Sequence, residues 1–176
     1  MPALKKSALS LGTLLLFFSL FFLVDVSPAH AEESDFDELS TLNCRVEGTM
    51  EGEPAEFWYR LHNIGTDDEA FRLDATNLES EKSMGIIIDQ AHDRSFYKEM
   101  GSESWQQVPS AMLKQFWNIY REEHITAIGG ADKWNEWAEA DKDEYLAEVE
   151  VEGEKQEVRV YDIEVDEPIE DSVFSP

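Results

Sequence analysis

The stretch Phe71–Trp105 decides the fold of this chain: FRLDATNLESEKSMGIIIDQAHDRSFYKEMGSESW. Apolar and polar residues alternate from Phe71 to Thr76, with the two-residue period of a half-buried strand. After a polar turn, the β-branched segment Met84–Ile88 predicts a second strand, and Ser95–Met100 predicts a third. Short polar connections between consecutive strands indicate an antiparallel meander with one apolar face and one solvated face.

Segments with the same two-residue period lie on both sides of this meander. Two precede it, Leu39–Val46 and Ala55–His62, and two follow it, Tyr145–Val151 and Val158–Val165. In the last segment the apolar positions change phase, which predicts a β-bulge near Val160-Tyr161. Together with the meander, these segments predict about seven or eight antiparallel strands in one sheet.

Between the two groups of strands the apolar period becomes helical. Pro109 suits a first helical turn, and the residues after it form a wide apolar stripe that ends near Glu123. The stripe consists of Met112, Leu113, Phe116, Trp117 and Tyr120. Asp132 can cap a second, shorter helix that carries Trp134 and Trp137. The predicted fold class is therefore α+β: a curved antiparallel sheet, an open half-barrel, covered by two helices.

The N-terminal residues have the pattern of a secretory signal peptide. Lys5 and Lys6 precede an apolar run over Ala8–Val24, and Ala29-His30-Ala31 fits an A-x-A cleavage site. We expect cleavage after Ala31 and export to the periplasm or to the cell exterior. The alternative is an uncleaved signal anchor; no other stretch is long and apolar enough to span a bilayer.

Acidic residues dominate the remainder of the chain. The 176 residues include 39 acidic and 14 basic ones, a formal net charge of −25, which argues against binding nucleic acid through a basic patch. We expect residues 32–38 to be a disordered acidic N-terminus and residues 39–176 to form one domain. The acidity fits export into a saline or alkaline medium, with simple solubility as the alternative.

The chain contains no pattern typical of a catalytic or metal site. Its single cysteine, Cys44, alternates with Leu42 and Val46 and is expected to be a buried core residue, not a reactive thiol. The histidines lack zinc-site spacing, and there is no nucleophile elbow, phosphate-binding glycine loop or EF-hand loop. We therefore predict a non-enzymatic protein without metal or cofactor; a secreted hydrolase is the distant alternative.

Several short motifs resemble those of the LolA/LolB/LppX-like superfamily of exported lipoprotein carriers and their uncharacterised relatives. The matching positions are Arg72 and Asp74 in the FRLD strand, Ile87, Ile88 and Asp89 in the GIIID strand, and Pro168, Ile169, Asp171, Ser172 and Phe174 near the end. The resemblance spans most of residues 39–176. It implies a curved antiparallel sheet closed by helices, with a hydrophobic cavity for acyl chains.

The candidate binding site is an apolar cavity between the sheet and the first helix. Its expected lining consists of Phe57, Tyr59, Phe71, Leu73, Ile86, Ile88 and Phe96 on the sheet, and Phe116 and Trp117 on the helix. The helix would act as a lid, and Arg72 is the candidate latch that pairs with an acid on this lid. The expected partner is a lipid or an acylated protein, with no nucleic acid and no membrane span after cleavage.

Two hypotheses for the function are therefore open. In the first, the chain is an exported carrier that binds a lipid or an acyl chain. In the second, the helix packs tightly on the sheet, the core is filled, and the chain is a protein-interaction or adaptor module of the cell envelope. The volume between the helices and the sheet distinguishes these hypotheses.

Overall fold

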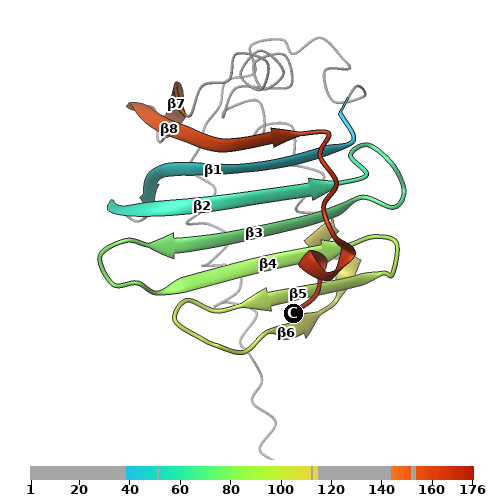
Figure 1. Cartoon of the computed structure of the whole chain (residues 1–176). Helices are drawn as coiled ribbons and strands as arrows, with labels where there is room; N and C mark the ends of the chain where they lie inside the picture. Colours follow the sequence, from blue (N-terminus) through green and yellow to red (C-terminus); the bar gives the residue numbers. More distant parts are fainter. Residues whose placement is uncertain (1–38, 51, 112, 115–143, 152–153) are drawn as a thin grey trace, which may run out of the picture.

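The computed structural model describes residues 39–50, 52–111, 113–114, 144–151 and 154–176. The eight strands of these residues form one antiparallel sheet with the order β6-β5-β4-β3-β2-β1-β8-β7 (Figure 1). The strands are β1 (Thr41–Met50), β2 (Glu53–His62), β3 (Ala70–Asn77), β4 (Ser83–Asp89), β5 (Arg94–Lys98), β6 (Gln106–Val108), β7 (Glu144–Val151) and β8 (Glu154–Val165).

Strands β1 to β6 run as a meander in which each strand pairs with the next along the chain. Strand β8 pairs with the free side of β1, and β7 pairs with β8. The expected strand segments coincide with β1–β5, β7 and β8 to within a few residues, whereas the three-residue strand β6 was not expected. No described helix is long and apolar enough to cross a membrane.

The predicted α+β fold class, an open half-barrel covered by two helices, is wrong. The described residues form mostly one eight-stranded antiparallel sheet, and they contain no helix of seven or more residues. Helical backbone begins at Ser110 and includes Leu113, whose side chain is buried, and the second expected helix lies outside the described residues. An apolar stripe predicts which side chains would share a helix face, but it does not determine how much of a fold is helical. Residues 115–123 of the first expected helix lie outside the described residues.

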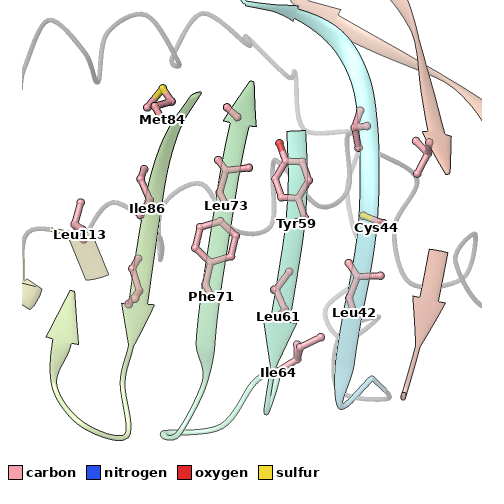
Figure 2. Close-up of a cluster of buried hydrophobic side chains, with 14 of the residues drawn as sticks. Leu42, Cys44, Tyr59, Leu61, Ile64, Phe71, Leu73, Met84, Ile86 and Leu113 are labelled. Carbon is pink, nitrogen blue, oxygen red and sulfur yellow. The ribbon is translucent and has the colours of Figure 1, made fainter. Parts of the chain in front are cut away.

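One side of the sheet, which we call the apolar face, carries the main core (Figure 2). Leu42, Cys44 and Leu61 have no exposed surface, and larger aromatic side chains such as Tyr59 and Phe71 fill the space beside them. Burial raises the pKa of the Cys44 thiol to about 12, as expected for a structural cysteine. The apolar face is therefore densely occupied by the protein's own side chains.

A β-bulge in β8 keeps its last residues in phase with this core. Val160 is paired with Val46 and Val165 with Leu42, but two residues of β8 lie opposite the single residue Cys44. One of them, Asp162, has a left-handed φ of 49°. The bulge thus lies one to two residues beyond its expected position, and it turns Val165 toward the main core.

The C-terminal segment, Asp166–Pro176, crosses the opposite side of the sheet, which we call the second face. In Figure 1 this red segment passes in front of β1, β2 and β3, and its 3-10 helix η1 (Asp171–Phe174) lies against β3 and β4. Phe174 is buried against Ala70 of β3 and Ile87 of β4. Strand β4 is consequently buried from both sides, which explains its continuous apolar run.

Candidate functional site

The expected cavity residues do not all lie together. Tyr59, Phe71, Leu73, Ile86 and Ile88 share the apolar face, and Phe57 is half-buried against the same cluster. Phe96 instead pairs with Ile87 and lies on the second face, so Tyr97 holds the place on the apolar face that was assigned to Phe96. Phe116 and Trp117 lie outside the described residues.

Arg72, the candidate lid latch, also lies on the second face, away from the apolar cluster. Its Nε donates to Asp74 Oδ2 at 2.7 Å, and its Nη1 donates to the carbonyl oxygens of Val173 at 2.8 Å and Ser175 at 3.3 Å. The partner of Arg72 is therefore the C-terminal segment. The predicted latch paired Arg72 with an acid on the helix lid, and that lid lies mostly outside the described residues.

Trp58 occupies the centre of the second face, between two arginines. Arg45 is its cross-strand neighbour on β1, and Arg60 is two residues further along β2. The guanidinium carbons of Arg45 and Arg60 lie 4.3 Å and 3.8 Å from the centroid of the Trp58 ring. The indole N–H donates to Asn43 Oδ1 at 2.6 Å, so both stacking and a hydrogen bond fix the ring.

Two arginines share one carboxylate beside this ring. Nη2 of Arg60 donates to Asp74 Oδ2, which also accepts the hydrogen bond from Arg72. The Arg60 side chain is only 8% exposed, and its Nε is buried without a hydrogen-bond partner among the described residues. Burial lowers the pKa of Arg60 to about 10 although Asp74 favours the charged form, so Arg60 stays a cation at neutral pH.

On the side of Trp58 nearer β8, Arg45 is linked through Glu56 to the hydroxyl of Tyr161. Arg45 forms ion pairs with Glu56 at 2.8 Å and with Asp162 at 3.3 Å, and the hydroxyl of Tyr161 donates to Glu56. Burial and this hydrogen bond raise the pKa of Tyr161 to about 12. These contacts hold Arg45 in one orientation over Trp58.

A second tryptophan, Trp105, lies against the sheet at the other end of the network. Its ring atoms Cη2 and Cζ2 occupy the space that a side chain at Gly85 would fill. The Arg72 guanidinium carbon is 5.2 Å and the Lys98 Nζ is 5.4 Å from the ring centroid. The second face therefore carries a row of cations and tryptophans over β1 to β5, in which each tryptophan lies between two cations. We call the row the Trp-Arg row: Arg45, Trp58, Arg60, Arg72, Trp105 and Lys98.

The Trp-Arg row was only partly visible in the sequence. The two-residue period of Ala55–His62 puts Trp58 and Arg60 on the same side of their strand, in agreement with the pairings of β2. The pairing of Arg45 with Trp58 and of Trp58 with Asp74 depends on the register of strands distant in sequence. No short motif carries that information.

No metal site accompanies the row. Within the described residues, no group of three or more His, Cys, Asp or Glu side chains is arranged to hold a metal ion.

Searches against protein-family models, curated proteins and solved structures find no match for this chain. The resemblance to LolA-like carriers therefore stays a prediction.

Proposed function

We propose that this chain is an exported, non-enzymatic protein-interaction module that recognises its partner through the Trp-Arg row of the second face. The observation that supports it is the placement of Trp58 between two guanidinium groups on the second face. Tryptophan and arginine are the residue types that most often dominate the energy of protein interfaces.

The row is also pre-organised for binding. Trp58 is held by Asn43, Arg45 by Glu56, and Arg60 by Asp74, so these long side chains are already ordered before a partner arrives. Ordering a flexible side chain on binding costs about 0.5–1.5 kcal/mol, and this surface avoids much of that cost. Export of the module is proposed from its N-terminal pattern of basic residues, apolar run and A-x-A site.

Site-specific photo-cross-linking tests the proposal. A photoreactive amino acid at Thr76, on the second face beside Asp74, should capture an envelope protein, and the same residue at exposed Leu78 is the matched control. Trp58→Ala should remove the Thr76 product, because loss of a hot-spot residue costs 2 kcal/mol or more, which is about 30-fold in Kd. A product at Thr76 that persists unchanged in Trp58→Ala would contradict the proposal.

Carrier-like binding of a lipid or acyl chain is the second candidate function. It is favoured by the shared apolar face of Tyr59, Phe71, Leu73, Ile86 and Ile88, which is continuous across three strands. The tight burial of these side chains argues against it, since an acyl chain would have to displace them. Titration of the delipidated protein with a fluorescent fatty acid decides: saturable binding tighter than about 10 μM would favour the carrier.

A further inference from the structure

The C-terminal segment is attached to the second face by side chains and not by a strand ladder. Its last backbone hydrogen bond to a described strand joins the Asp166 N–H to the Thr41 carbonyl, at 3.1 Å. The next backbone hydrogen bonds, from Val173 to Glu170 and from Ser175 to Ser172, stay within the segment. Beyond Asp166, the segment thus lies across the strands like a bound peptide.

Its anchor is one aromatic side chain. Phe174 is buried between Ala70 and Ile87, and the His62 ring stacks on it with centroids 6.0 Å apart and planes inclined by 26°. Half-buried apolar groups surround this position on both sides: Phe96, Trp105, Ile169 and Val173. The second face therefore contains an aromatic-binding position with a floor from β3 and β4 and one wall from β2.

The backbone on both sides of this anchor is held by one guanidinium. Arg72 Nη1 donates to the carbonyls of Val173 and Ser175, the residues immediately before and after Phe174. Asp74 accepts a hydrogen bond from Arg72 Nε and so fixes the orientation of the guanidinium group. Carbonyl groups are common to all peptides, so Arg72 can hold the backbone of other segments that place an aromatic ring in this position.

We propose that this strip, formed by His62, Ala70, Arg72 and Ile87, is a peptide-docking site. In this structure the site is occupied by the chain's own C-terminal segment. A partner protein replaces this segment with a short peptide of the same chemistry, in which an aromatic residue lies between two residues whose backbone carbonyls can accept hydrogen bonds from Arg72. The inference rests on the proposed interaction function, of which it names the ligand class. A second copy of this chain is disfavoured as the partner, because each copy carries a net charge of −25.

The resident segment competes with any incoming peptide. A tethered segment has an effective concentration in the millimolar range, so a free peptide binds the unmodified protein weakly. Phe174→Ala removes the anchor of the competitor while the residues of the strip stay in place. The substitution should therefore open the site without altering it.

Fluorescence polarisation on the full chain tests this. The probe is a fluorescein-labelled peptide with the sequence of residues 168–176, PIEDSVFSP. It should bind Phe174→Ala at least about tenfold more tightly than the unmodified protein, and the same peptide with Phe replaced by Ala should not bind. Leu146→Ala, at an exposed position of β7, is the control and should behave as the unmodified protein.

Hydrogen exchange on the unmodified protein provides a second measurement that does not depend on the folding of a variant. Excess peptide should accelerate amide exchange in residues 167–176 and leave β3 and β4 protected. Absence of saturable binding to a natively folded Phe174→Ala protein would overturn the inference. A dimer that dissociates in Phe174→Ala would overturn the choice of a separate partner. Cross-linking at Thr76 reports on Trp58, so it can fail or succeed independently.

Discussion

Substitution of Gly85 by alanine should displace Trp105 from the sheet. Gly85 is buried in β4, and a Cβ atom added there would lie 2.5 Å from Cη2 and 3.1 Å from Cζ2 of Trp105. It would also lie 3.0 Å from Asp74 Oδ1. Carbon atoms do not approach to 2.5 Å, so either the ring or the strand must move, and the half-buried ring is the more mobile of the two.

The expected cost follows from what the ring loses. A fully buried tryptophan removes roughly 150–250 Å² from water, worth about 4–6 kcal/mol at 25 cal/mol per Å². Trp105 is half-buried and would keep part of its contacts, which leaves about 1–3 kcal/mol, including its contacts with Arg72 and Lys98. Alanine is better than glycine inside a strand by about 0.5–1 kcal/mol, so the net destabilisation should be about 0.5–2 kcal/mol.

Urea unfolding followed by circular dichroism measures this, with the Trp105→Ala background as the control. Once the ring is absent, the close contact that remains is Asp74 Oδ1 at 3.0 Å, which a small shift of that side chain relieves, so Gly85→Ala should stabilise the protein by up to about 1 kcal/mol. The sign of the effect of Gly85→Ala should therefore reverse between the two backgrounds. Equal destabilisation in both backgrounds would show that Trp105 does not cause it, and would refute this account of the second face.

Two further predictions concern buried groups. Because burial raises its pKa to about 12, the Cys44 thiol should resist a thiol reagent at pH 8 in the folded protein and react at once in urea; rapid reaction without denaturant would contradict its burial. Burial alone would raise the pKa of the Asp89 carboxyl, but hydrogen bonds from Arg94 and His92 outweigh burial and lower it. The stabilisation from Asp89 is thus present above pH 4 and lost as the pH falls through the lowered pKa, so Asp89→Asn should cost about 1–3 kcal/mol at pH 7 and flatten the acid unfolding curve measured by urea titration. Unchanged stability at pH 7 would exclude this role.

The strands could be predicted because the alternation of apolar and polar residues is a local signal. The face of the sheet on which each side chain lies could not always be predicted. In β5 the aromatic residues Phe96 and Tyr97 are adjacent, so alternation alone permits either of them to point toward the core. The pairing of Tyr97 with Ile86 settles the choice, and it is set by the turn between β4 and β5. The prediction that Phe96 lies on the apolar face is therefore wrong. A one-residue error in the alternation of a strand moves every side chain of that strand to the opposite face.

The fold class, with its two covering helices, was wrong for a different reason. Apolar periodicity between Met112 and Tyr120 predicts which side chains would share a helix face, but it carries no information on whether such a helix covers a sheet made of strands from both sides of the sequence. Phe174 shows what local patterning does not give, since it is a single apolar residue near the end of the sequence and is nevertheless buried. Its partners on β3 and β4 belong to strands that lie more than 80 residues away, and only the folded sheet brings them together.

The last prediction concerns the bulge in β8, where Asp162 lies opposite Cys44 and adopts a left-handed φ of 49°. Such a backbone costs most residues about 1 kcal/mol, whereas glycine, asparagine and aspartate tolerate it.

The ion pair of Asp162 with Arg45, at 3.3 Å, is largely exposed and should contribute about 0–1 kcal/mol. Asp162→Asn removes the charge and keeps the conformational tolerance, so its cost in urea unfolding isolates the ion pair. Asp162→Gly should be about as stable as the parent, because relief of the backbone offsets the lost pair, while Asp162→Ala should be less stable than Asp162→Gly by about 1 kcal/mol. Equal stability of the alanine and glycine variants would mean that no left-handed residue is required here. Val165 would then need another route to the main core, and the pairing of Tyr161 with Arg45 on one side of the bulge and of Val165 with Leu42 on the other would lose its explanation.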